Sequence, residues 1–185
     1  MAIQLNDRDH LIFKLIDEHQ VLLEKHISWF ISNNEKPVLI RDRLRKLFYL
    51  DYLLCHRHGS KLPWWTTPTK PLVYLLSPMA RTCSGLPQAE LDLFDTEVQR
   101  HWLEVANIRM IHLIAQKDGQ ISQFSWLTLK PDQSGKKTAD AKVSFGSNGN
   151  LHKMAIVNHP AVSNVLIEEW SIALKDKYVD KLLIT

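Results

Sequence analysis

The chain begins with a run of apolar residues at helical spacing. They recur at intervals of one, three and four positions and form a single face: Leu11, Ile12, Leu15 and Ile16. Asn6 can accept a hydrogen bond from the free N–H groups at the start of such a helix. The pattern breaks at Glu18-His19-Gln20. The sequence therefore predicts a first helix that begins at Asn6 or Asp7 and ends near residue 18.

Two further helices are expected in the next thirty or so residues. The second has apolar residues across 22–30 and stops at the turn-like cluster Ser32-Asn33-Asn34. The third starts at Pro37, which suits a first helical turn because its missing N–H costs nothing there. Its apolar stripe consists of Ile40, Leu44 and Leu47. Three short helices with a tight turn before the third outline a helix-turn-helix.

Apolar and β-branched residues then indicate two strands, at 52–56 and 72–76. The segment between them is rich in Gly, Pro and Thr and carries several cations. This pattern predicts a β-hairpin with a long basic tip, known as a wing. We therefore predict a winged helix-turn-helix domain over residues 1–84.

The second half predicts a small α+β domain over residues 85–185, because Gly85-Leu86-Pro87 marks a boundary. A helical pattern follows over 88–117 and stops at Asp118-Gly119. This helix is longer than average, so it is either broken, packed within the chain or used in a dimer. The remaining expectations are strands at 124–129, 141–145 and 151–157, a loop at 130–138, a four-residue turn at 146–149 and a helix at 162–175. The strands form a short antiparallel sheet.

The composition is typical of a globular protein and bears on its partners and its cellular compartment. Of the residues, 45% are hydrophobic and 23% are charged, which is enough apolar content for a real core. The net charge of +3 permits a nucleic-acid partner without requiring one. The two cysteines form neither a disulfide framework nor a zinc motif, which is typical of a reducing cytoplasm. No signal peptide and no apolar run of membrane-spanning length is evident, so we expect a cytoplasmic protein without membrane contact.

The basic residues of the third helix and the wing are the candidate DNA contacts. Arg41 and Arg45 project from the flank opposite the apolar stripe, and Arg43 lies at the stripe's edge. A basic helix face that is simply solvated is the alternative, but the adjoining wing favours a helix that enters the major groove while the wing touches the backbone. The expected DNA-binding residues are Lys36, Arg41, Arg43, Arg45, Lys46, Arg57, Lys61 and Lys70.

The pair Trp64-Trp65 stands out in the wing. One interpretation is an apolar anchor that packs the hairpin tip against the protein itself. The other is a partner contact or a stacking platform for nucleic acid, because aromatic faces suit bases and sugars. An exposed tryptophan pair is costly without a partner, so one of the two is expected to be buried.

Three segments together resemble the N-terminal winged helix of the replication-relaxation family of plasmids and other mobile elements. They are residues 5–19 (LNDRDHLIFKLIDEH), 41–54 (RDRLRKLFYLDYLL) and 71–81 (PLVYLLSPMAR), within a resemblance that covers residues 5–82. Leu76-Ser77-Pro78 matches the ending of the family's wing strand. The resemblance implies a protein that binds double-stranded DNA as an accessory or regulatory factor in conjugative transfer, replication or transcription. Its expected partners are relaxosome or replication proteins and a second copy of the chain.

The same resemblance raises a catalytic alternative, a mobilization-type DNA-nicking enzyme. The family's second domain often resembles a restriction-endonuclease core, to which His101 and Asp140 correspond. The next strand, residues 154–158, lacks the carboxylate of that pattern. Metal-dependent cleavage needs at least two anionic oxygens to hold the cation, so we predict no cofactor and no metal site and favour a non-enzyme. A third alternative is a protein-interaction module that uses the winged helix as a scaffold.

The histidines of His56-Arg57-His58 superficially resemble the metal-binding pair of rolling-circle nickases. Such pairs place an apolar residue between the histidines on a buried strand, whereas here Arg57 stands between them. We therefore expect phosphate contact or solvent exposure for the two histidines rather than metal ligation.

Overall fold

The computed structural model describes residues 4–34, 37–89, 92–129, 139–158 and 181–184. The chain divides into two compact units, Met1–Met110 and Ile111–Thr185. The division falls within the helix α5 (Thr96–Lys117), whereas the sequence suggested a domain boundary between residues 84 and 85. Both units mix helices with antiparallel strands, so the expected α+β class is confirmed.

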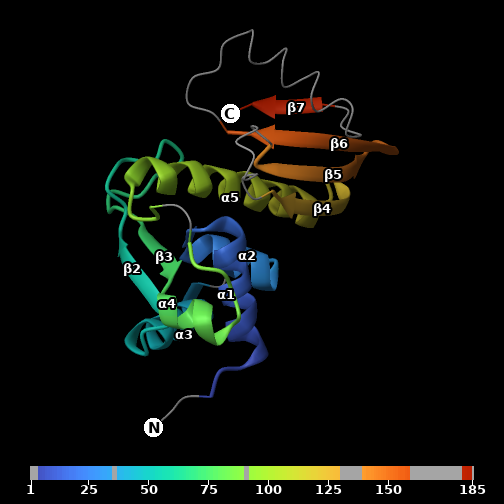
Figure 1. Ribbon diagram of the computed structural model, residues 1–185. Coiled ribbons are helices and arrows are strands. Elements are labelled where there is room, and N and C mark those ends of the chain that lie inside the picture. The colour runs from blue at the N-terminus through green and yellow to red at the C-terminus, as the bar shows by residue number, and fades with distance from the viewer. Residues whose placement is uncertain (1–3, 35–36, 90–91, 130–138, 159–180, 185) are drawn as a thin grey trace. The chain divides into compact units, whose positions relative to one another are not determined.

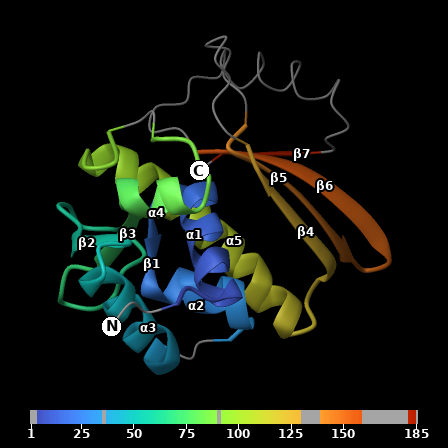
Figure 2. The same cartoon turned by 60° about the horizontal axis from the view of Figure 1, so that its bottom comes forward.

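The first unit contains α1 (Asp7–His19), β1 (Leu22–Leu23), α2 (Glu24–Ser32), α3 (Pro37–Tyr49), β2 (Leu53–Arg57), β3 (Leu72–Leu76) and α4 (Pro78–Cys83), followed by the start of α5. Its three strands form an antiparallel sheet in the order β1-β3-β2. Figures 1 and 2 show α1, α2 and α3 gathered around this sheet.

The predicted start of α1 is confirmed by its capping interactions. The Asn6 side chain accepts a hydrogen bond from the Asp9 backbone N–H at 3.1 Å, and the Asp9 carboxylate accepts one from the Asn6 N–H at 2.9 Å. These two bonds satisfy donors that a helix start otherwise leaves free. The helix ends at His19, close to the predicted break.

The core of the first unit confirms most of the predicted apolar faces. Ile12, Leu15 and Ile16 are buried from α1, but Leu11 is exposed and Phe13 takes its place in the core. The stripe predicted for α3 is fully confirmed, because Ile40, Leu44 and Leu47 are all buried.

One helix assignment is wrong at its start. Residues 22 and 23 form the short strand β1, which pairs with β3 through Leu22↔Tyr74 and Leu23↔Val73, and α2 begins only at Glu24. Both leucines are buried, and their spacing is compatible with a helix as well as with a strand. Their conformation is determined by pairing with β3, about fifty residues further along the chain.

The predicted hairpin is confirmed to within one residue. β2 and β3 pair from Leu53↔Leu76 to Arg57↔Leu72, so residues 58–71 form the loop that joins them. β3 leads into α4, a helix that the sequence pattern did not predict. The Ser77 hydroxyl caps it by accepting from the Ala80 N–H at 3.1 Å, and Pro78 occupies its first turn.

Ion pairs connect the helices of the first unit, and two of them involve a buried carboxylate of α1. Arg81 of α4 donates to the Asp17 carboxylate of α1 at 2.6 Å, and both side chains are buried. Arg43 of α3 forms two hydrogen bonds with the carboxylate of Asp9, of which the Nε bond is 2.6 Å long. Burial alone would raise the pKa of Asp9, but the hydrogen bonds from Arg43 and Asn6 outweigh it and lower the pKa below its usual value.

The long helix is shorter than predicted. α5 begins at Thr96 and not at residue 88, because Asp95 caps it by accepting from the Glu97 and Val98 N–H groups at 2.8 and 3.0 Å. Phe94, which lies within the range predicted to be helical, precedes the helix and is exposed. The end at Lys117 is as predicted, and Gly119 has the positive φ of +73° that ends such helices.

The second unit contains the last turns of α5 and a four-stranded sheet in the order β4-β5-β6-β7. The strands are β4 (Ser122–Thr128), β5 (Ala141–Ser147), β6 (Asn150–Val157) and β7 (Lys181–Ile184). The first three pair antiparallel, as expected. β7, which the sequence pattern did not predict, pairs with β6 in parallel. Figure 2 shows β4, β5 and β6 as neighbouring strands of a twisted sheet.

The turn between β5 and β6 is tighter than predicted. β5 continues to Ser147 and only Asn148 and Gly149 lie between the strands, both with positive φ (51° and 77°). Of the other expectations here, the loop at 130–138 and the helix at 162–175 lie outside the described residues.

Aromatic side chains organise the described part of this sheet. His112 from α5 stacks on Phe124 of β4 and also contacts Phe145 of β5, each at a centroid distance of 5.6 Å. Within the described part of the chain, no helix is both long and apolar enough to cross a membrane.

Candidate nucleic-acid interface

The exposed side of α3 carries the cations that the sequence singled out. Because Ile40, Leu44 and Leu47 are buried, the residues on the other flank face solvent, among them Arg41, Arg45 and Lys46. Lys36, the expected contact at the start of this helix, lies outside the described residues.

Arg41 is held by a carboxylate from α2. Its Nε and one terminal nitrogen donate to the two oxygens of Glu24 at 3.1 and 2.9 Å, which is the two-pronged geometry of a strong arginine–carboxylate pair. The Arg41 side chain is 53% exposed, whereas that of Glu24 is 18% exposed. The guanidinium is therefore fixed on one edge and open to solvent elsewhere.

Arg43 and Arg45 have different surroundings. Arg43 is 19% exposed and is paired with Asp9, whose side chain is fully buried. The positive charge of Arg43 therefore neutralises a carboxylate inside the fold. Arg45 is 60% exposed and approaches the exposed Asp42 at 3.9 Å, a contact of little energetic weight. Of these two predicted DNA contacts, only Arg45 presents its charge to solvent.

A groove of about 530 Å³ lies between the start of α2, α3 and the β2–β3 loop. The cations among its described lining are Lys25, Arg41, Arg57 and Lys70, and its carboxylate is Glu24. Trp64, Trp65 and the hydroxyls of Thr66, Thr67 and Thr69 complete the polar and aromatic wall. We call this cavity the basic groove. It brings together one predicted helix cation, two predicted wing cations and the tryptophan pair.

The tryptophan pair packs against α2. The Lys25 ammonium lies 4.4 Å from the centroid of Trp64 and 5.3 Å from that of Trp65, within cation–π range of both. Trp64 also contacts the ring of the buried His26 at 5.7 Å. Both tryptophans are partly buried rather than one being buried and one exposed. The anchoring interpretation therefore describes this contact, while both rings still line the basic groove.

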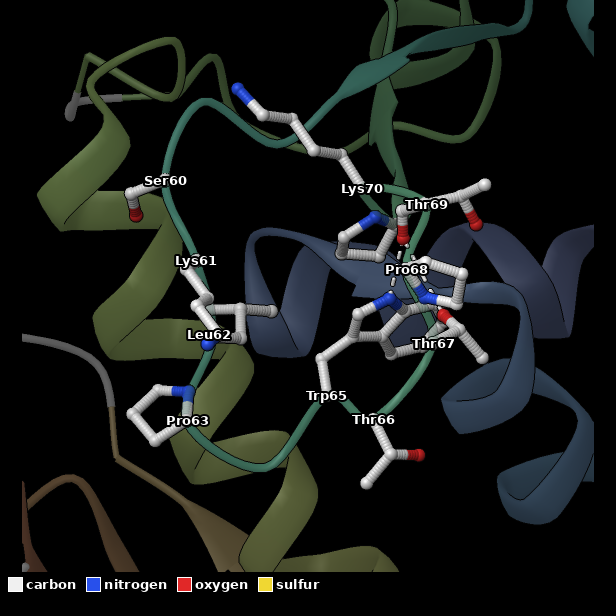
Figure 3. A pocket seen from close by; sticks show the side chains of 11 residues that line it. Ser60, Lys61, Leu62, Pro63, Trp65, Thr66, Thr67, Pro68, Thr69 and Lys70 are labelled. Carbon is white, nitrogen blue, oxygen red and sulfur yellow. Dashed lines mark hydrogen bonds between the residues drawn. The ribbon is translucent and has the colours of Figure 1, made fainter.

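Hydrogen bonds within the loop shape the wall of the groove. Arg57 donates to the Lys70 carbonyl at 2.7 Å, and the Lys70 ammonium donates to the Gly59 carbonyl at 2.8 Å. Figure 3 shows the Trp65 indole lying across the loop, where its N–H donates to the Thr69 carbonyl at 2.7 Å. Lys61 lines an adjoining hollow inside the loop, which Figure 3 draws and which shares Lys70 with the basic groove. Lys61 itself does not line the basic groove.

The two histidines of the 56–58 segment are engaged within the fold. His58 is buried, with its Nδ1 2.9 Å from the Ser60 carbonyl oxygen. His56 is half-buried, stacks on Phe94 at 5.6 Å, and has its Nε2 2.8 Å from the Gln99 side-chain nitrogen. The expectation of solvent exposure is therefore wrong for His58.

The two catalytic candidates belong to different units. His101 lies on α5 in the first unit and contacts Trp102 edge to face at 5.3 Å. Asp140 lies in the second unit, where its carboxylate accepts from the Asn158 backbone N–H at 2.6 Å. In the part of the chain that the structure describes, no group of three His, Cys, Asp or Glu side chains could hold a metal ion.

Glu24 and Lys25 were not among the predicted site residues. Both follow the short strand β1, and a helix predicted over this segment gives no reason to expect them beside the β2–β3 loop. The sequence signal that could have identified them is their position, because this charged pair directly follows two leucines.

No protein-family model, curated protein or solved structure matches the chain.

Proposed function

We propose that the chain binds double-stranded DNA through the exposed side of α3 and the basic groove. The observation that carries this proposal is the convergence of Lys25, Arg41, Arg57 and Lys70 on one cavity. Paired tryptophans and threonine hydroxyls beside such cations suit a sugar-phosphate backbone, because hydroxyls and cations contact phosphate and aromatic rings contact sugars and bases.

The proposed domain type is a winged helix-turn-helix. Its support is the order of elements: helix, strand, two helices joined by a short turn, and then a hairpin whose second strand pairs with the first strand of the unit. In this interpretation α3 enters the major groove and the β2–β3 loop is the wing.

The biological role that we propose follows the family resemblance of residues 5–82. The protein acts as an accessory or regulatory factor of a plasmid or mobile element, in replication, conjugative transfer or transcription, and binds DNA as a dimer. The nicking and interaction-module alternatives remain predictions from the sequence.

The experiment is a salt titration of DNA binding. Affinity for a labelled duplex of about 25 base pairs, measured by fluorescence anisotropy between 50 and 200 mM salt, should fall with a log–log slope of about −0.9 for each phosphate neutralised. Arg41→Ala and Arg45→Ala should each weaken binding several-fold. Binding that neither substitution changes, or that does not depend on salt, overturns the proposal.

A further inference from the structure

We infer that Glu24 is a positioning residue that presents Arg41 to a guanine base. This inference rests on the proposed function and names the chemical group that the site reads. It starts from the geometry of the Glu24–Arg41 pair.

A guanidinium has five N–H donors in a planar fork. Glu24 accepts from Nε at 3.1 Å and from one terminal nitrogen at 2.9 Å, which occupies one edge of the fork. The adjoining edge, formed by the two terminal nitrogens, keeps a parallel pair of donors, because each terminal nitrogen carries two N–H groups. That edge matches the two acceptors of guanine in the major groove, O6 and N7, which is the commonest specific contact of arginine with DNA.

The carboxylate itself is well held. Glu24 is the first residue of α2, where the positive end of the helix dipole favours a negative charge, and its side chain is mostly shielded from solvent. A fixed carboxylate restricts the rotamers of a long, half-exposed arginine, so less entropy is lost when the arginine meets a base. Arg41 also lines the basic groove and stands beside its cations, which would hold the phosphates on either side of the base.

The same helix supplies a natural control. Arg45 meets Asp42 through one contact of 3.9 Å, and both side chains are more than half exposed. Asp42 therefore neutralises charge near an arginine without fixing its orientation. Replacing Glu24 or Asp42 by its amide removes one negative charge in each case, but only the first change releases a fixed guanidinium.

The test uses the full chain and duplexes selected from random DNA by the wild-type protein. Each guanine of the selected site is replaced in turn by 7-deazaguanine, which keeps O6 and lacks the N7 acceptor. Wild type should lose about 5- to 20-fold in affinity at one guanine, as expected for one bond of a two-bond base contact. Asp42→Asn should keep this loss.

Glu24→Gln should change two quantities in opposite directions, the affinity for unrelated DNA and the sensitivity to 7-deazaguanine. Its affinity for unrelated duplex DNA should rise about two- to five-fold, because a negative charge next to the phosphates is gone. Its sensitivity to 7-deazaguanine should fall below two-fold. Loss of fold would lower both quantities, so the opposed changes separate positioning from a merely structural role. Arg41→Lys, which keeps the charge and Glu24 but loses the fork, should likewise be insensitive to 7-deazaguanine.

Three results overturn the inference while leaving the proposed function in place. They are a wild-type site without a sensitive guanine, full sensitivity in Glu24→Gln or Arg41→Lys, and loss of sensitivity in Asp42→Asn. A wild-type protein that binds no duplex at any salt concentration contradicts the proposed function itself.

Discussion

Three arginines at two-residue spacing on α3 have three different environments. Arg41 is fixed by Glu24, Arg43 is paired with the buried Asp9, and Arg45 is the most exposed. Helical periodicity could predict that Arg43 lies at the edge of the apolar stripe. It could not predict the partner of Arg43, because Asp9 lies 34 residues away on another helix.

Arg43→Ala should therefore lower stability rather than DNA affinity. Removing it leaves the Asp9 carboxylate buried without its partner, which costs about 2 to 3 kcal/mol of unfolding free energy in a urea titration. Arg45→Ala is the control and should change stability by less than about 0.5 kcal/mol. If Arg43→Ala kept its stability and lost much of its DNA affinity, the prediction would be wrong and Arg43 would be a DNA contact.

Asp51 illustrates a backbone requirement at a single residue. It lies between α3 and β2 with a φ of +59°, in the left-handed region that Asp tolerates better than most residues. Asp51→Val should cost about 1 to 2 kcal/mol, because a β-branched residue is strained there, whereas Asp51→Gly should be neutral or slightly stabilising. Equal unfolding midpoints for the Val and Gly variants would show that the turn relaxes.

At the scale of elements, local signals were enough where capping and periodicity agreed. The start of α1, the stripe of α3 and the two strands of the hairpin each follow from residues close together in the chain. β1 and β7 do not, because each is a short strand whose conformation depends on a distant partner strand. The basic groove has the same origin: its walls come from α2, α3 and the loop, and only Arg41, Arg57, Lys70 and the tryptophans carried a sequence signal.

The attachment of α4 to α1 gives a prediction about elements. Arg81 and Asp17 form a buried pair, so Arg81→Met alone should cost about 3 to 5 kcal/mol because the buried Asp17 carboxylate loses the positive charge of Arg81 and its hydrogen bond. The double variant Asp17→Leu/Arg81→Met should recover much of that loss. Chemical denaturation of the three proteins measures the coupling, and strictly additive losses would show that the two side chains do not stabilise the fold as a pair.

The whole molecule should lose stability in mild acid. His19 and His26 are fully buried. Burial, with the nearby Lys25, lowers the pKa of His26 to about 3, and burial and Arg109 lower the pKa of His19 well below its usual value. The unfolded chain therefore binds more protons than the folded chain below pH 6.5. The free energy of unfolding falls as pH drops through the window from 6.5 towards 3, by up to about 1.4 kcal/mol per pH unit for each group.

His26→Gln tests this prediction. Glutamine keeps an acceptor for the Leu23 N–H that His26 Nδ1 receives at 3.4 Å, and it does not titrate. Stability measured by urea unfolding from pH 7.5 to 4.5 should fall less steeply in this variant than in wild type. Identical slopes in His26→Gln and wild type would contradict the assignment.

The central claim is that the basic groove, rather than diffuse surface charge, binds DNA. Two lysines of one loop separate these possibilities, because Lys70 lines the groove and Lys61 does not, while both are exposed. The most direct measurement is the salt dependence of duplex binding for Lys70→Gln and Lys61→Gln. Lys70→Gln should reduce the log–log slope by about 1, and Lys61→Gln should leave it near the wild-type value. Equal slopes for the two variants would contradict the claim.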